Sequence, residues 1–180
     1  SGIGVHVEPE WVFNFGRNLQ LLTGLLIGII GTLGMDIWAL LARLLFRFPV
    51  TDWAMIGRWV AYMPKGRYFH SPIAASDKIN NEQTIGWVVH YLTGVVYGIL
   101  YLFIVQVILD RVPTIQSALI FGLITLAAPW LIMQPGLGLG VFACKAPRPW
   151  LIRLINISMH LVFAIAMYAG WVLIENIYGG

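Results

Sequence analysis

The sequence predicts an all-α, polytopic membrane protein with four transmembrane helices and a short interfacial helix between the first two. Three observations predict this class. Hydrophobic residues make up 59% of the 180 residues and charged residues 11%, against roughly 45–50% and roughly 25% in soluble domains. The mean hydropathy is +0.80. Four separate apolar stretches each reach the length of about 20 residues that a helix needs to cross a hydrocarbon core.

The same composition excludes several classes of protein. The chain has too little charge to cover a soluble globule, so it is neither a soluble enzyme nor a disordered protein. A single cysteine, Cys144, cannot form an intrachain disulfide, which excludes a disulfide-stapled secreted domain. The net charge of +3 is better explained by basic loops on one side of a bilayer than by nucleic-acid binding.

The four predicted spans form one transmembrane domain, residues 19–180. An N-terminal segment, residues 1–18, precedes it, and we expect that segment outside the cytoplasm. The second and third spans are joined by a tight turn, and the third and fourth by a segment rich in Gly and Pro. The spans are roughly Leu19–Phe46, Ile85–Leu109, Ile115–Met133 and Trp150–Ile174.

The first connection, residues 47–84, is long enough to hold a helix of its own. Thr51 or Asp52 is a suitable N-cap for the segment TDWAMIGRWVAYM. Apolar residues then recur near helical spacing. Two interpretations stay open: a helix lying in the membrane interface with its Trp residues at the headgroups, or a loop helix packed on the bundle. The apolar positions are Trp53, Ile56, Val60 and Met63.

The distribution of Lys and Arg predicts the orientation. Only Arg17 and Arg111 lie on the side of the N-terminus, and the other nine lie on or near the opposite side. The positive-inside rule therefore puts the first and third connections in the cytoplasm and both termini outside, which in a bacterium means the inner membrane. The nine are Arg43, Arg47, Arg58, Lys65, Arg67, Lys78, Lys145, Arg148 and Arg153.

The polar residues within the spans all lie toward the cytoplasmic side. Ionisable residues inside a membrane are costly and indicate function by default. We expect Arg58, on the loop helix, to reach inward to Asp36, so that Asp36→Ala would leave an unpaired Arg. The alternative is that these side chains satisfy one another and only fix the packing. The candidate ligand-binding residues are Asp36, Arg58, His90, Gln134, Asn156 and His160.

Glycine and proline patterns predict local features of the helices. Gly94-x-x-x-Gly98 is typical of closely packed membrane helices. The glycines of Gly136-Leu-Gly-Leu-Gly140 do not follow a strand, so they are not a nucleotide-binding loop. We expect the third span to break at Gln134-Pro135, because Pro135 has no N–H and disfavours the α conformation at the residue before it.

Several segments together resemble an uncharacterised bacterial family of small four-helix inner-membrane proteins, a domain of unknown function. These segments are GTLGMDIWALLARLLF, DWAMIGRW, EQTIGWVVHYLTGVVYG, MQPGLGLG and APRPWLIRL, followed by His160. The resemblance covers roughly residues 31–170 and implies four spans, but no reaction. The residues that it singles out are Asp36, Arg58, Glu82, His90, Gln134, Pro135 and His160.

Three functional hypotheses follow from these residues. The first is a protein that binds or transports a small polar or anionic solute, with a homo-oligomer forming the pathway. The second is an accessory subunit of a larger membrane complex, in which His90 and His160 ligate a haem or chlorin; the absence of CxxCH excludes covalent c-type haem. The third is an intramembrane enzyme with a metal held by Asp36, Glu82, His70 and His90.

Overall fold

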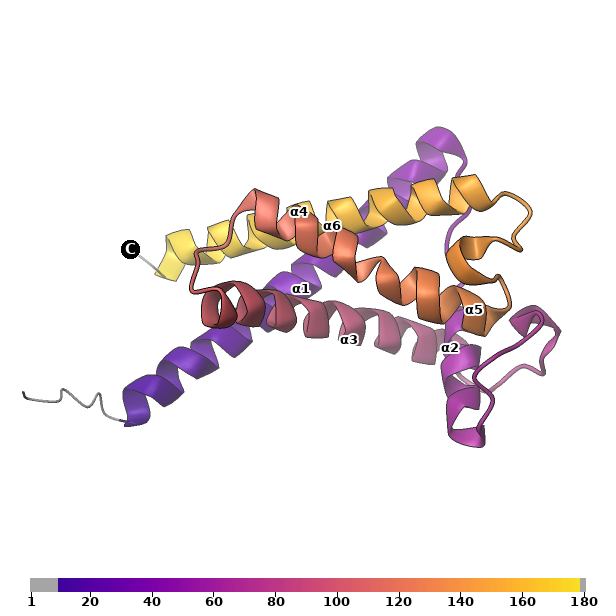
Figure 1. Ribbon diagram of the computed structural model, residues 1–180, viewed down its shortest axis with the longest axis horizontal. Helices are drawn as coiled ribbons and strands as arrows, with labels where there is room; N and C mark the ends of the chain where they lie inside the picture. The colour runs from indigo at the N-terminus through magenta and orange to yellow at the C-terminus, as the bar shows by residue number, and fades with distance from the viewer. Residues whose placement is uncertain (1–9, 179–180) are drawn as a thin grey trace, which may run out of the picture.

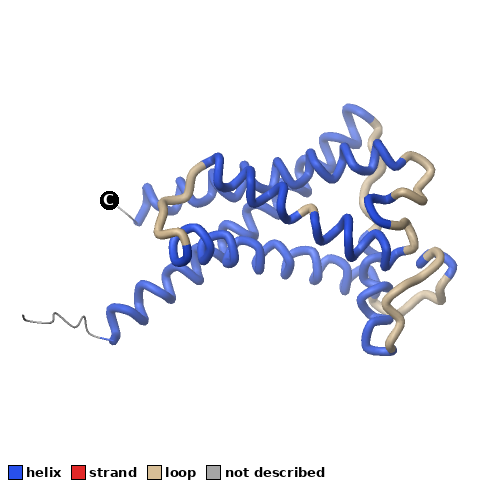
Figure 2. Tube along the Cα trace, in the orientation of Figure 1, coloured by secondary structure: helices blue, strands red, loops and turns tan. Residues whose placement is uncertain are grey.

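A computed structural model describes residues 10–178 of the chain and the side chains of residues 19–177. Within this part every regular element is helical, and four helical segments are long and apolar enough to cross a membrane (Figures 1 and 2). The predicted fold class is confirmed. The helices are α1 (Glu10–Phe46), α2 (Trp53–Tyr62), α3 (Glu82–Leu102), α4 (Ile115–Thr125), α5 (Gln134–Leu137) and α6 (Pro149–Tyr178).

The four spans agree with the predicted ones to within a few residues. They are Leu19–Phe46, Glu82–Ile108, Ile115–Leu137 and Pro149–Ile177. A π-helical turn, Phe103–Ile108, prolongs α3. The N-terminal segment predicted at residues 1–18 lies partly outside the described residues, and α1 already begins at Glu10.

The bundle is arranged around α1, which passes obliquely behind α3 and α6 in Figure 1. α1 packs along both α3 and α6, and α4 packs on α6, whereas α3 and α4 meet at only a few positions. The beginning of α1 and the end of α6 lie at one end of the bundle, and α2 and α5 lie at the other (Figure 1).

Glycines bring α1 and α3 together, as the sequence predicted. A β-carbon at Gly98 would lie 2.6 Å from the backbone nitrogen of Gly28, and one at Gly24 would lie 2.7 Å from the α-carbon of Ile99. Only hydrogen atoms fit between the two backbones at this distance. Small residues therefore allow the close packing that drives helix association in lipid.

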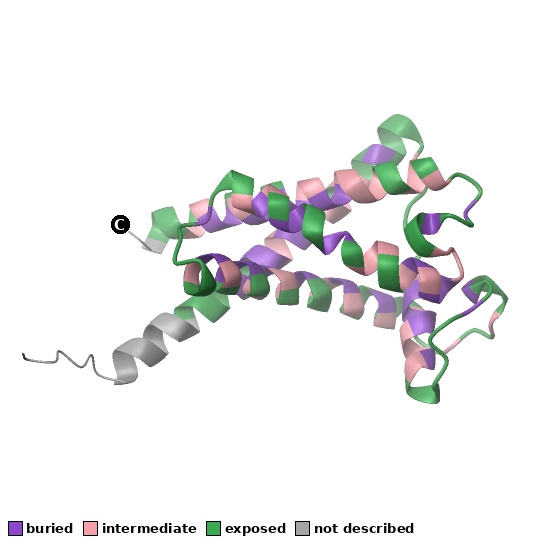
Figure 3. Ribbon diagram, in the orientation of Figure 1, coloured by how far each residue is buried: buried purple, intermediate pink, exposed green. Residues whose placement is uncertain are grey.

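Apolar side chains cover the outside of the bundle as well as its core. Tyr101, Phe163 and Met167 are buried at the centre. Ile37, at 61% exposed, and Leu44, at 68%, are among many large apolar residues on the outer surface. Exposed positions occur along all the long helices in Figure 3. In a membrane these side chains contact lipid tails, so their exposure to the bilayer has no hydrophobic cost.

The break predicted at Gln134-Pro135 is in the wrong place. Gln134 has α-helical angles, and Pro135 lies in the first turn of α5, where a missing N–H does little harm. The distortion occurs one turn earlier, where residues Pro129–Met133 form a π-helical turn and the N–H of Gln134 donates to the Pro129 carbonyl. Gly138 ends the helix in the left-handed conformation, with φ at 88°.

Candidate functional site

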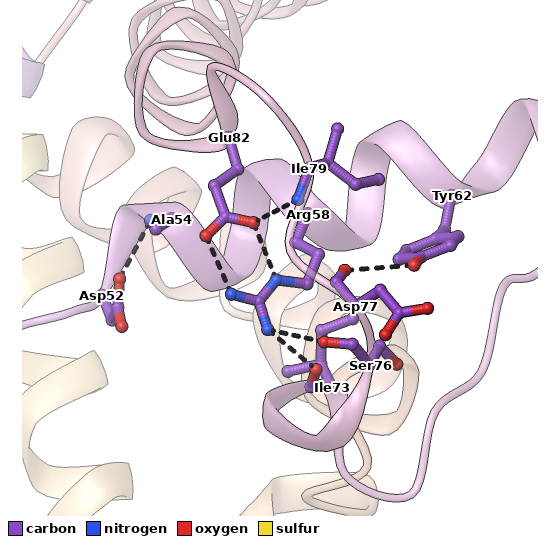
Figure 4. A network of polar contacts seen from close by, with 9 residues as sticks. All are labelled: Asp52, Ala54, Arg58, Tyr62, Ile73, Ser76, Asp77, Ile79 and Glu82. Atoms are coloured by element: carbon purple, nitrogen blue, oxygen red, sulfur yellow. Dashed lines mark hydrogen bonds and ion pairs between the residues drawn. The ribbon is translucent and has the colours of Figure 1, made fainter.

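The loop helix α2 is held across the start of α3 by an ion pair (Figure 4). The Arg58 guanidinium donates two hydrogen bonds of 2.8 Å, one to each carboxylate oxygen of Glu82. Its remaining nitrogen donates to the Ser76 carbonyl at 3.1 Å. Hydrogen bonding to Glu82 raises the pKa of Arg58 above its ordinary range. Arg58 is 6% exposed, so this bidentate pair is a structural element of the docked helix.

The expected pairing of Arg58 with Asp36 is therefore wrong. Glu82 begins α3. It lies against α2, because Gly57 and Gly86 allow the backbones of the two helices to touch. A β-carbon at Gly57 would collide with the carbonyl oxygen of Glu82. Because Glu82 is this close, the Arg58 guanidinium finds its hydrogen-bond partners next to α2 and does not pair with Asp36.

The contacts of α2 favour the packed loop helix over the interfacial one. The Asp52 side chain caps the helix by accepting from the Ala54 N–H at 3.0 Å. Trp59 is buried, and its indole N–H donates to the Tyr68 carbonyl at 2.8 Å. Trp53 stacks on the ring of His90, with 3.9 Å between the ring centroids. These Trp side chains face protein.

Asp36 of α1 is directed toward α3. Its carboxylate accepts from the Nε2–H of His90 at 3.0 Å and from the Tyr91 hydroxyl at 2.8 Å. Asp36 therefore faces a neighbouring helix, as the cost of an acidic group in lipid requires. The hydrogen bond to Asp36 fixes the orientation of the His90 ring and commits its Nε2.

Asn156 of α6 receives two hydrogen bonds on one oxygen. The Trp130 indole N–H donates to Oδ1 at 3.2 Å, and the Gln134 side-chain amide donates to it at 2.8 Å. An indole N–H can only donate, so the Asn156 atom that faces it must be the oxygen. This assignment leaves the NH₂ of Asn156 with no hydrogen-bond partner among the described residues.

His160 lies one helical turn beyond Asn156. Like His90, it has a hydrogen-bond partner in the described residues at only one of its two ring nitrogens. The Thr125 hydroxyl donates to the Gly122 carbonyl at 2.7 Å, and the same oxygen lies 2.8 Å from His160 Nδ1. A hydroxyl has one proton, so Nδ1–H must donate to Thr125. In the neutral ring the other nitrogen, Nε2, is then an acceptor, and no group of the described residues bonds to it.

His90, Asn156 and His160 line one cavity of about 250 Å³. All four spans contribute to its wall, and α2 closes it at one end through Trp53, Ile56 and Trp59. Most of the wall is apolar, with Met35, Tyr97 and Phe163 among the larger side chains. Side chains with polar groups also line the cavity. They are His90, Asn156 and His160, the hydroxyl-bearing Thr32, Thr51, Thr93 and Tyr97, and the indoles of Trp53 and Trp59.

The structure thus brings together half of the predicted site residues. His90, Asn156 and His160 line the cavity. Asp36 and Gln134 lie behind this wall, where Asp36 holds His90 and Gln134 holds Asn156. Arg58 is committed to Glu82 instead. The role of these residues in binding a ligand stays a prediction.

The metal site suggested by the sequence does not form. Glu82 is paired with Arg58, and His70 Nδ1 contacts the Gly136 carbonyl at 3.3 Å. In the part of the chain that the structure describes, no three His, Cys, Asp or Glu side chains gather closely enough to hold a metal ion. The haem or chlorin hypothesis stays a prediction; the bond to Asp36 leaves only Nδ1 of His90 without a partner in the described residues.

Sequence reasoning missed the residues that fix the site residues in place. Trp130 is four residues before Gln134, so the two share a helix face, and this spacing was a usable signal. Tyr91 and Thr125 gave none, because their partners lie 55 and 35 residues away in the chain. Trp53 was predicted only as an apolar position of the loop helix, interfacial or packed, and its contact with His90 was not foreseen.

Comparison with known proteins identifies the chain at the level of a family. The sequence matches the family described as Protein of unknown function (DUF2938) over residues 25–174. No curated protein and no solved structure matches the chain. The matched region contains His90, Asn156 and His160, together with Asp36, Arg58 and Glu82.

Proposed function

This chain belongs to the DUF2938 family of unknown function, and we propose that it binds a small, uncharged molecule carrying a hydroxyl group in the cavity between His90 and His160. An apolar cavity with a few convergent polar groups is the usual form of a small-molecule site. The flat side chains Trp53, Tyr97 and Phe163 in its wall favour a ligand that contains a ring.

One observation carries the proposal. Asn156 and His160 are four residues apart on α6 and lie on the same face of the helix. Asn156 offers N–H donors and His160 offers an acceptor nitrogen, and both side chains line the cavity. A hydroxyl both accepts and donates, so one group of the ligand can satisfy both residues. A ligand that only accepts can satisfy Asn156 alone.

The charges around the cavity favour a neutral ligand over the anion considered from the sequence. Among the residues whose side chains are described, no Lys or Arg belongs to the cavity wall. Arg58 is committed to Glu82, and the Arg153 side chain donates to the Phe142 carbonyl at 2.9 Å. The Asp36 carboxylate, bonded to His90 of the wall, would repel an anion. A charged ligand would enter an apolar cavity without a counter-ion, at a high desolvation cost.

Binding of 4-methylphenol and of its methyl ether, 4-methylanisole, tests this function. The two probes have the same ring, but only the phenol can donate. We expect the phenol to bind more tightly to the protein in lipid nanodiscs by about 1–3 kcal/mol, which is the cost of leaving a buried acceptor unpaired. Isothermal titration calorimetry measures both affinities.

Substitution of His160, the proposed acceptor, tests whether the preference for the phenol arises in this cavity. His160→Phe keeps a ring and removes both nitrogens, so it should bind the phenol and the ether equally. His70→Phe is the matched control, because His70 is also a buried histidine but lies outside this cavity; it should keep the preference for the phenol. Equal binding of the two probes by the unaltered protein, or binding of neither, would contradict the proposed function.

The membrane setting is part of the same proposal. Four spans place both ends of the described chain on one side, and the bias in Lys and Arg supports an extracytoplasmic location for them and the cytoplasmic membrane as the site of action. The cavity would then lie in the cytoplasmic half of the bilayer. Transport and assembly into a homo-oligomer or a larger complex stay predictions; the cavity is built from one chain, so binding itself needs no second copy.

A further inference from the structure

A long groove between α3 and α4 adjoins the cavity that holds His90, Asn156 and His160. This groove has a volume of about 910 Å³ and runs along both helices toward the turn that joins them. It exists because α3 packs on α1 while α4 packs on α6, so the two helices hardly meet. The groove and the cavity share Tyr97, Ala128 and Ile132 in their walls, so the two adjoin at these residues.

The groove opens toward the bilayer. Its rim carries large apolar residues that are exposed on the outer surface, among them Ile120 at 60%, Ile124 at 64% and Ile132 at 62%. Most of its polar side chains lie near the turn between the two helices: Arg111, Thr114, Gln116 and Ser117. At the other end the wall includes Thr125, whose hydroxyl is already bonded to Gly122 and His160. Along most of its length, the wall offers only van der Waals contacts, which suit a lipid chain.

We infer that the ligand of the cavity is an amphiphile that enters sideways from the membrane. Its uncharged hydroxylated head would occupy the cavity between His90 and His160, and its apolar chain would lie in the groove between α3 and α4. The inference rests on the proposed function and adds the class of ligand and its route. A ligand from water would need no apolar groove beside the polar cavity, whereas a membrane lipid needs both.

A series of 4-alkylphenols tests the route. Affinities are expressed as the mole fraction of probe in the bilayer, which removes the effect of partitioning. A chain that moves from lipid into the groove leaves one apolar medium for another, so 4-nonylphenol should bind within about threefold of 4-methylphenol. A cavity closed toward the lipid has no room for the nonyl chain and would reject it.

A substitution that fills the groove provides a second test of the route. Ala127 lines the groove but not the cavity, so Ala127→Trp should fill the groove and weaken 4-nonylphenol by about tenfold or more, through overpacking, without affecting 4-methylphenol. Leu123→Trp is the matched control. It adds the same side chain to an exposed position of α4 that lines neither the groove nor the cavity, and it should bind both probes like the unaltered protein.

The outcomes separate the two proposals. If 4-methylphenol binds with the expected preference over its ether but 4-nonylphenol does not bind, the lateral route is wrong and the proposed function stands. Equal effects of Ala127→Trp on the short and the long probe would also overturn the route. If the short phenol fails to bind, the proposed function is wrong, and the route loses its basis with it.

Discussion

Arg58 of α2 and Glu82 of α3 form a bidentate ion pair in which both hydrogen bonds measure 2.8 Å and both side chains are largely buried. Removal of one partner leaves the other charge buried without compensation. We therefore expect Glu82→Gln to destabilise the protein by about 3–5 kcal/mol. Thermal denaturation in detergent, followed by circular dichroism, measures the loss. Lys78→Gln is the control, because it removes an exposed charge nearby and should leave the melting temperature unchanged.

Because Arg58 pairs with Glu82, we expect Asp36 and Arg58 to contribute independently to the free energy of unfolding. Asp36 contacts His90 and Tyr91, whereas Arg58 contacts Glu82 and two backbone carbonyls, so the two residues share no partner. In a double-mutant cycle, the effects of Asp36→Ala and Arg58→Ala on the free energy of unfolding should add to within about 0.5 kcal/mol. The cycle of Arg58→Ala with Glu82→Ala should show strong coupling. Coupling between Asp36 and Arg58 instead would restore the pairing that the sequence suggested.

The close contact of α1 with α3 makes Gly98 intolerant of a side chain. A β-carbon there meets the backbone of Gly28, which cannot move aside without separating the helices. We expect Gly98→Ala to cost about 1–3 kcal/mol of stability. Gly170→Ala is a matched helical control, since the nearest atom to its β-carbon is the end of the Ile30 side chain, Cδ1 at 2.9 Å, which can rotate away. Equal melting temperatures for the two variants would show that the helices are not in backbone contact.

The proposed orientation predicts which positions a membrane-impermeant thiol reagent reaches from outside. In a Cys144→Ser background, Val12→Cys should be labelled in intact cells, and Lys78→Cys should be labelled only after the membrane is permeabilised. Labelling of Lys78→Cys alone in intact cells would reverse the orientation.

The sequence was sufficient for the spans because the signal for a transmembrane helix is local. Length and hydropathy located all four, and the Gly94–Gly98 spacing indicated close packing. The break in the third span was misplaced by one turn because two prolines, Pro129 and Pro135, lie close together, and the sequence does not show which of them falls in a new first turn.

The site was predictable only in part, because its contacts join distant segments. The common depth of the polar residues in the spans predicted a cluster toward the cytoplasmic side, and three of them, His90, Asn156 and His160, line one cavity. The partner of Arg58 was predicted wrongly, because depth in the membrane does not say which acidic residue a loop helix will face. Gly57 and Gly86 decide that, by bringing Arg58 against Glu82.

The central claim is that an amphiphile binds between His90 and His160 with its head against Asn156. An experimental structure of the protein extracted with its native lipids tests it most directly. The account predicts compact density in the cavity, within hydrogen-bonding distance of the Asn156 amide and His160 Nε2, and continuous with an elongated feature between α3 and α4. A cavity filled by the protein's own side chains, with α3 packed against α4 along its length, would contradict it.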